Sequence, residues 1–358
     1  MTLHIPSINA LPSTDIAIIG AGPVGLFAVF QAGMLNLSTH VFDSLDVIGG
    51  QCAELYPEKP IYDIPAFPSL TGGELIQNLA AQAAPFKPTY HLGQSVVSIE
   101  RVDESKFLVK TSSGYMVLAK VIMVAGGSGL FTPIRPELTN LSEYEGRSVF
   151  YSVRDPKAFA GKRIVIAGGG DSAVDWAIVL SKWADHIYMI HRRDRFRAAP
   201  ESISRMNELV QQKKIELIVP YQLDGLYGSA GKLNGVSVST MGGDKRLLEA
   251  DILLPLFGLV TDLGPISKWG LIFDNGSIVV NPADCATNIL GVYAIGDIVK
   301  YPGKLKLILT GFAEAASAMH AAYHYISPDK PLHSEHSTTR GVPSLPMPSL
   351  NTKANEFN

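Results

Sequence analysis

Cysteine is scarce in this 358-residue chain. It occurs only at Cys52 and Cys285, and the chain has no Cys-x-x-Cys pair. This scarcity excludes a disulfide scaffold, a cysteine-based zinc site and a dithiol redox motif. We therefore expect two buried, inert thiols and no bound metal.

Charge of either sign is also sparse. Charged residues make up 18% and hydrophobic residues 46% of the chain, and the formal net charge is −3. This composition is typical of a globular protein with a sizeable core, and the length favours two domains. The weak negative charge does not favour a nucleic-acid partner.

The residues before Lys59 contain no lysine or arginine. A secretory signal peptide needs a basic region, so none is expected here. The uncharged run over residues 16–41 is long enough to cross a membrane, but four glycines and Pro23 interrupt it. We therefore expect a cytoplasmic protein with no membrane segment.

A glycine turn near the N-terminus organises the chain. An apolar run over residues 16–19 leads into Gly20-x-Gly22-x-x-Gly25, and a stretch poor in glycine and proline follows over residues 26–37. This order of strand, turn and helix is typical of a dinucleotide site. Gly20 permits the tight turn, Gly22 lets the backbone approach a pyrophosphate, and Gly25 lets helix and strand pack closely. An ordinary glycine-rich turn is the weaker alternative.

A second turn of this kind begins at Gly168. The strand over residues 162–167 leads into Gly168-x-Gly170-x-x-Ala173, where alanine takes the third position, and a helix is expected over residues 172–184. The two turns differ in what ends the next strand. After the first turn the next strand ends in Asp43, at the spacing where a carboxylate binds ribose hydroxyls.

The strand after the second turn, over residues 186–190, ends instead in a basic loop. Arginines bind a 2′-phosphate through charge-assisted bonds, whereas a carboxylate would repel it. The sequence therefore predicts NADP(H) at the second turn, with Arg192 and Arg193 as first choices, Arg197 next, and His191 beside them. A solvated basic loop is the alternative.

The first turn suits FAD, because a short buried strand near the C-terminus ends in Gly296-Asp297. We expect an α/β fold with two Rossmann-like, three-layer nucleotide-binding domains. The FAD-binding domain is discontinuous (1–127 and 259–326), the NADPH-binding domain is inserted (128–258), and residues 327–358 form a C-terminal extension.

Helices are expected over 72–84 and 310–325. Segments 96–99, 107–110 and 115–118 are expected to form a small inserted sheet, followed by a separate buried strand from Lys120.

The paired turns with Gly296-Asp297 resemble the thioredoxin reductase group of flavoproteins over nearly the whole chain. That group carries Cys-x-x-Cys before its second turn, where this chain has Tyr151-Ser-Val-Arg154. A closer resemblance is to the thioredoxin-reductase-like ferredoxin–NADP+ reductases. The segments that carry it are Gly49-Gly-Gln51, Leu55-Tyr-Pro-Glu-Lys59, Gly168-Gly-Gly-Asp-Ser-Ala-Val-Asp-Trp176, His191-Arg-Arg193, Tyr301-Pro-Gly-Lys-Leu-Lys306 and His336-Ser-Thr-Thr339.

This resemblance implies two catalytic candidates, with Tyr56 stacked on one flavin face and His336 covering the other. It also implies a homodimer, in which the C-terminal extension reaches the partner's flavin. The further flavin contacts that it implies are Gln51, Val96, Phe131, Asp297 and Thr338. On the residues alone, an ordinary loop tyrosine is the better interpretation of Tyr56 and a solvated tail histidine that of His336, and His333 competes for the same role.

The implied reaction is hydride transfer from NADPH to FAD, followed by single-electron transfer to ferredoxin or flavodoxin. One domain is expected to rotate, with hinges at Gly126-Gly127 and Phe257-Gly-Leu-Val260. The alternatives are an NADPH oxidase or diaphorase that uses oxygen or quinones, and a slow flavin- and NADPH-binding sensor. Acidic ferredoxins would need a basic patch, although each basic side chain could equally be only solvated. The candidates are Lys300, Lys304, Lys306, Arg205, Lys213 and Lys214.

Overall fold

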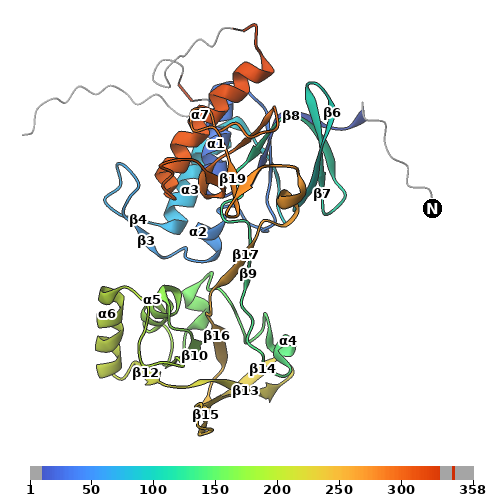
Figure 1. Ribbon diagram of the computed structural model, residues 1–358. Helices are drawn as coiled ribbons and strands as arrows, with labels where there is room; N and C mark the ends of the chain where they lie inside the picture. Colours follow the sequence, from blue (N-terminus) through green and yellow to red (C-terminus); the bar gives the residue numbers. More distant parts are fainter. Residues whose placement is uncertain (1–9, 331–340, 343–358) are drawn as a thin grey trace, which may run out of the picture. The chain divides into compact units, whose positions relative to one another are not determined.

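The computed structural model describes residues 10–330 and 341–342, and within them the chain forms two compact units (Figure 1). Unit 1 comprises the residues up to Ala53, Pro57–Leu130 and the residues from Leu263 on, and unit 2 comprises Glu54–Tyr56 and Phe131–Asp262. The expected α/β fold, with one unit inserted into the other in sequence, is confirmed. Apart from the short segment Glu54–Tyr56, the chain passes between the units after Leu130 and after Asp262, a few residues beyond the expected crossings.

Unit 1 is built on a seven-stranded sheet with the order β5-β2-β1-β8-β7-β6, to which β20 adds by pairing with β8. β1, β2, β5, β8 and β20 are parallel, as a dinucleotide fold requires, and β6 and β7 are antiparallel additions. The strands are β1 Ser13–Ile19, β2 Thr39–Phe42, β5 Thr89–His91, β6 Val96–Asp103, β7 Lys106–Thr111, β8 Met116–Val124 and β20 Val292–Ala294.

The prediction of a small inserted sheet was wrong. Segments 115–118 and 120–124 belong to one strand, β8, which pairs in parallel with β1 from Ser13 to Ile19 and antiparallel with β7. Lys120 lies within this strand, and its ammonium group forms an ion pair with Asp15 (2.8 Å). Strands β6 and β7 therefore extend the main sheet.

Three long helices pack on this sheet: α1 Pro23–Met34, α3 Gly72–Ala83 and α7 Ile308–Ile326. α1 begins earlier than expected because Pro23 occupies its first turn, where a missing N–H costs nothing. α3 is confirmed and starts with a capping box between Thr71 and Glu74. The shorter elements are α2 Gln51–Glu54, β3 Pro60–Ile61, β4 Leu70–Thr71, η2 Ala84–Phe86, η4 Gly264–Lys268, β18 Phe273–Asp274, β19 Ser277–Val279, η5 Gly296–Ile298 and β21 Val299–Lys300.

Unit 2 contains a parallel four-stranded sheet with the order β12-β11-β10-β16 and a separate antiparallel sheet with the order β13-β14-β15. The parallel strands are β10 Arg163–Ala167, β11 His186–Ile190, β12 Ile215–Ile218 and β16 Ile252–Pro255. The antiparallel strands are β13 Gln222–Ser229, β14 Lys232–Ser239 and β15 Lys245–Glu249. The helices are α4 Leu141–Tyr144, η3 Pro156–Phe159, α5 Asp171–Leu180 and α6 Pro200–Gln211, and β9 Leu130–Pro133 pairs with β17 Leu259–Asp262.

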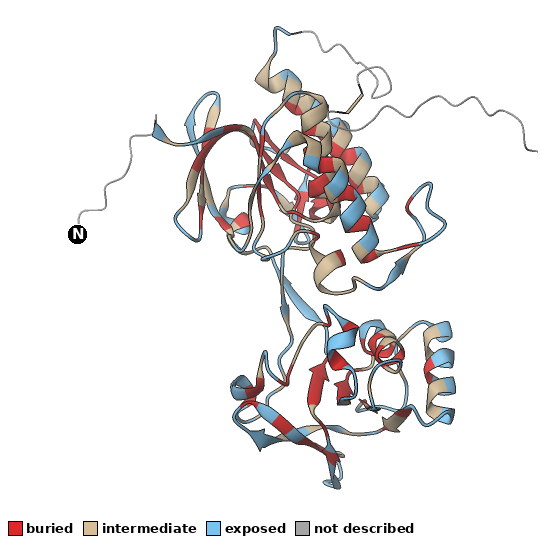
Figure 2. Ribbon diagram, turned by 180° about the vertical axis from the view of Figure 1, so that it is seen from behind, coloured by how far each residue is buried: buried red, intermediate tan, exposed pale blue. Residues whose placement is uncertain are grey.

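The parallel sheet of unit 2 is covered on both faces, which gives three layers. Ile164 and Ile166 of β10 pack with α5 and α6 residues in one core cluster. Val165 of β10 packs in a second cluster with Val236 and Val238 of β14. Figure 2 shows the same burial in both units, with buried residues concentrated in the central strands and in the helix faces that cover them.

Both cysteines are buried and unpaired, as expected. Among the described residues, no helix is long and apolar enough to span a membrane, and no group of three or more metal-ligating side chains occurs.

Candidate dinucleotide sites

The first glycine turn joins β1 to α1 in unit 1. Gly20 has φ +114°, and a Cβ there would overlap the carbonyl oxygen of Ala125. A Cβ on Gly25 would overlap the carbonyl oxygen of Gly20, so only glycine permits this close contact between the helix and the turn. Gly22 caps the helix and has nothing within 4 Å of its Cβ position. The open side of the turn is therefore at Gly22, beside the unpaired N–H groups that begin α1.

Asp43 follows β2 and faces this turn. Its carboxylate accepts hydrogen bonds from the backbone N–H groups of Ala21 (2.7 Å) and Leu45 (2.9 Å). Burial raises the pKa of Asp43 in spite of these bonds. Each carboxylate oxygen has a second lone pair, so the group can also accept from ribose hydroxyls.

A second glycine pair packs against the first turn. The N–H of Gly49 donates to the carbonyl of Ala21 (2.8 Å), and a Cβ on Gly50 would lie 3.1 Å from the Cα of Gly22. The short helix α2 begins at the next residue, Gln51, which is half-buried. The Gly49-Gly-Gln51 segment thus lies beside the open side of the turn.

The remaining expected flavin contacts are distributed as follows. Tyr56 is half-buried and follows α2, whose last residue, Glu54, accepts hydrogen bonds from Ser152 (3.2 Å) and Arg154 (2.9 Å); Glu54–Tyr56 belong to unit 2. Val96 is buried in the core at the start of β6, and Phe131 is half-buried in β9. Asp297 lies in η5, and His333, His336 and Thr338 lie outside the described residues.

The turn that carries Asp297 is held by a residue that the sequence analysis missed. Glu314 of α7 is 5% exposed and accepts hydrogen bonds from the N–H of Gly296 (2.7 Å) and the hydroxyl of Tyr301 (2.6 Å). Burial raises the pKa of Tyr301, and its bond to Glu314 raises it further. Glu314 also pairs with Lys304, whose side chain is equally buried. The available signal was that Glu314 is the one carboxylate in this helix, which is rich in alanine.

This pairing corrects part of the expected basic patch. Lys304 is buried against Glu314, so it is not available to a docking protein. Lys300 is paired with Asp274 (2.6 Å). Lys306 is exposed, and so are the unit 2 candidates Arg205, Lys213 and Lys214.

The second glycine turn joins β10 to α5 in unit 2. A Cβ on Gly168 would lie 2.8 Å from the Cβ of Ala173, and one on Gly169 would overlap the ring of His191. Gly170 caps α5 and, like Gly22, has nothing within 4 Å of its Cβ position. Ala173 is fully buried, with its methyl group in the helix–sheet core.

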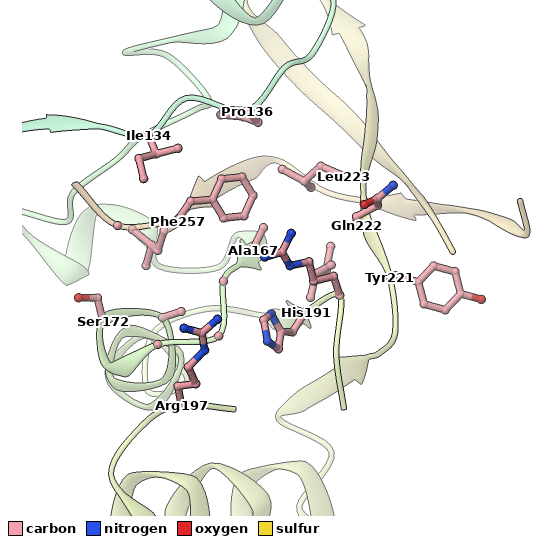
Figure 3. A pocket seen from close by; sticks show the side chains of 18 of the residues that line it. Ile134, Pro136, Ala167, Ser172, His191, Arg197, Tyr221, Gln222, Leu223 and Phe257 are labelled. Atoms are coloured by element: carbon pink, nitrogen blue, oxygen red, sulfur yellow. The ribbon is translucent and has the colours of Figure 1, made fainter. Parts of the chain in front are cut away.

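A cavity of about 820 Å³ opens at this turn, entirely within unit 2. In Figure 3, Ser172, His191 and Arg197 lie on one side of it, and Ile134 and Phe257 lie on the other. Backbone N–H groups at the start of α5 and guanidinium groups therefore meet a wall of apolar side chains, which suits a phosphate-bearing cofactor with flat rings.

The basic loop after β11 is fastened to the turn by its main chain. The N–H of Arg197 donates to the carbonyl of Gly169 (2.7 Å), and the N–H of Ala199 donates to Asp171 (3.0 Å). Arg192 and Arg197 line the cavity, whereas Arg193 is exposed on the same loop outside the lining. Burial lowers the pKa of His191, and the neighbouring positive charges of the loop arginines lower it further.

The chain contains two dinucleotide turns, and the strand that follows each turn ends differently, in Asp43 after β2 and in a basic loop after β11. This combination defines a class of two-nucleotide oxidoreductases. Residues 14–322 match the family model described as pyridine nucleotide-disulphide oxidoreductase, and the chain belongs to this family.

Its relatives and structural neighbours carry two kinds of name. A protein of Rhodospirillum rubrum named "Ferredoxin--NADP reductase" is 53% identical over 336 residues, covering 93% of this chain and 97% of the relative. One of the same name from Rickettsia rickettsii is 55% identical and covers 92% and 97%. Among solved structures, Lactococcus lactis thioredoxin reductase has a TM-score of 0.68 and 25% identity, covering 88% of this chain and 99% of its own. The T. acidophilum enzyme also scores 0.68, at 26% identity, covering 87% and 98%.

Proposed function

We propose that this protein is an FAD-dependent ferredoxin–NADP+ reductase. The supporting observation is that a chain with the thioredoxin reductase fold has Tyr151-Ser-Val-Arg154 in place of the dithiol, while relatives that are 53% and 55% identical over the aligned residues are named ferredoxin–NADP reductases. Without a dithiol, electrons must leave the flavin directly for an external acceptor.

The two turns divide the cofactors in this proposal. Gly20, Gly22 and Gly25 hold the FAD pyrophosphate, and Asp43 binds the adenosine ribose. Flavin contacts come from Gln51, Tyr56, Val96, Phe131, Asp297 and Thr338, and His336 covers the ring. When bound, FAD supplies the conversion of a two-electron hydride into single electrons.

NADPH is assigned to the cavity of unit 2. Its pyrophosphate meets the glycine turn Gly168-x-Gly170-x-x-Ala173 on the open side at Gly170, where α5 begins. Its 2′-phosphate meets Arg192 and Arg197, which line the cavity beside His191, and Arg193, on the same loop outside the lining, contributes only long-range positive charge. The apolar residues opposite, among them Phe257, exclude water from the bound cofactor.

The partner in this proposal is ferredoxin or flavodoxin, and the protein acts in the cytoplasm as a homodimer completed by the partner's C-terminal extension. The positive charge that attracts the acidic partner comes from the exposed residues Lys306, Arg205, Lys213 and Lys214. If docking is electrostatic, raising salt slows ferredoxin reduction and leaves NADPH-driven flavin bleaching unchanged. Equal slowing of both steps would refute the patch.

The deciding experiment compares acceptors. The purified protein should be yellow and should oxidise NADPH much faster with ferredoxin or flavodoxin than with oxygen or quinones. A faster rate with oxygen or quinones would make it an oxidase or diaphorase, and slow turnover with every acceptor would favour a sensor. A protein that binds no flavin would refute the proposal as a whole.

A further inference from the structure

Both oxygens of the Glu314 carboxylate are occupied, and each has a different kind of partner. Oε2 accepts from the backbone N–H of Gly296 (2.7 Å). Oε1 accepts from the hydroxyl of Tyr301 (2.6 Å) and from the ammonium group of Lys304. The side chains of Glu314 and Lys304 are each 5% exposed, so neither group can exchange its partner for water.

The same part of α7 packs against the first glycine turn. A Cβ on Gly311 would overlap Val24 and would lie 3.4 Å from the Cα of Gly296. Val24 in turn lies 3.5 Å from the Cβ position of Gly296, which has φ +81°. Helix α7, the first turn of α1 and the Gly296 turn therefore touch one another, and Glu314 joins α7 to the Gly296 turn by a direct hydrogen bond.

We propose that Glu314 is a positioning residue for the flavin site, which acts by fixing the backbone at Gly296 and thereby the side chain of Asp297. The inference rests on the proposed function, because it places FAD in unit 1. A buried N–H that lost its acceptor would pull the turn toward another partner. Asp297, the next residue, would then leave the position from which it reaches the cofactor.

The two partners of the carboxylate allow a selective test. Glutamine has one acceptor oxygen and one donor amide group. In E314Q the oxygen turns to the charged Lys304, so the amide faces the N–H of Gly296 and the turn loses its acceptor. In E314Q/K304M the charge is gone, and the oxygen can turn back to Gly296.

The measurement is titration of apoprotein with FAD, followed by the quenching of flavin fluorescence. We expect E314Q to raise the Kd for FAD by about tenfold, the loss expected for one buried hydrogen bond. E314Q/K304M should return to within about threefold of wild type, since the acceptor is restored. The matched control is Y301F, which removes a bond to the same carboxylate but not the one to Gly296, and it should also stay within about threefold.

Circular dichroism establishes folding, and NADPH binding to unit 2 should be unchanged in each variant. A folded E314Q with wild-type FAD affinity would overturn the inference, and so would an E314Q/K304M variant no better than E314Q. If E314Q does not fold, the double variant and Y301F decide, since a tenfold loss in either contradicts positioning through Gly296. Wild-type protein that binds no FAD would refute the proposed function instead.

Discussion

The two glycine turns share a spacing but differ in how tightly they are closed. At the first turn, Cβ atoms on Gly20 and Gly25 would both overlap backbone oxygens. At the second, a Cβ on Gly168 would likewise overlap a backbone oxygen, that of Leu256, but the third position already carries a methyl group, since Ala173 fits in the core. The middle glycine has open space in both turns. The turns therefore share a tightly packed first position and an open middle position, and they differ at the third position, where only the first turn requires glycine.

The residues that follow the second strand of each site, Asp43 and His191, differ in charge type, but burial favours the neutral form of both. Burial raises the pKa of Asp43 and lowers that of His191, so each group is driven toward its neutral form. Asp43 is held by two backbone N–H groups, whereas His191 lies among arginines. The first site thus offers hydrogen-bond acceptors to a sugar, and the second offers positive charge to a phosphate.

The largest expected effect comes from exchanging the third residue of each turn. Gly25→Ala forces a methyl group onto the backbone oxygen of Gly20, and we expect it to destabilise unit 1 by about 3 kcal/mol or more and to abolish FAD retention. Ala173→Gly removes a methyl group without a clash and should cost about 1 kcal/mol. Urea unfolding and flavin content after purification measure both. If the two substitutions lower the free energy of unfolding equally, the closer contact between helix and strand at Gly25 makes no difference to stability.

A smaller effect is expected at the basic loop. Arg192→Ala removes a guanidinium that lines the cavity, and we expect the Kd for NADPH to rise by roughly 10- to 100-fold, the loss of a charge-assisted hydrogen bond. The Kd for NADH should change little, because NADH lacks the 2′-phosphate. Calorimetric titration with both nucleotides measures this.

Arg193→Ala is the matched control for this test, since the same charge is removed from the same loop but outside the cavity lining. We expect a rise of no more than about threefold. If Arg193→Ala weakened NADPH as much as Arg192→Ala, the phosphate would lie outside the cavity rather than within it.

The smallest effect is the pH dependence of unit 2. Because the pKa of His191 is lowered in the folded state, the unfolded state binds more protons as the pH falls. The contribution of neutral His191 to stability is fully present above its unfolded pKa of about 6.5 and is lost as the pH falls through the lower folded value. Unfolding should therefore become easier from pH 7.5 to 5, and His191→Gln should flatten this change.

Tryptophan fluorescence can isolate this signal. The chain has three tryptophans, and in a Trp269→Phe background the remaining two, Trp176 and Trp183, both belong to unit 2. A His191→Gln protein with the same pH dependence as wild type would show that other groups govern acid stability.

Features that depend on neighbouring residues could be predicted from the sequence, and features that depend on contacts between distant residues could not. The two turns, α3 and β11 depend on neighbouring residues and were predicted. The split of β8 was predicted wrongly because its continuity depends on pairing with β1, a strand distant in sequence. The bond from Gly296 to Glu314 joins residues 18 apart, and only the packing of α7 on the turn brings them together. The same packing removed Lys304 from the surface.

The bonds that fasten the basic loop are main-chain and aspartate bonds, and none of them involves a guanidinium group. Arg197 is held through its backbone N–H to Gly169, and the loop end is held through Ala199 to Asp171. The exposed arginine side chains can therefore be replaced without releasing the loop. In the proposed function these arginines select NADPH, so we expect substitution of their side chains to shift the coenzyme preference toward NADH while the loop keeps its backbone contacts.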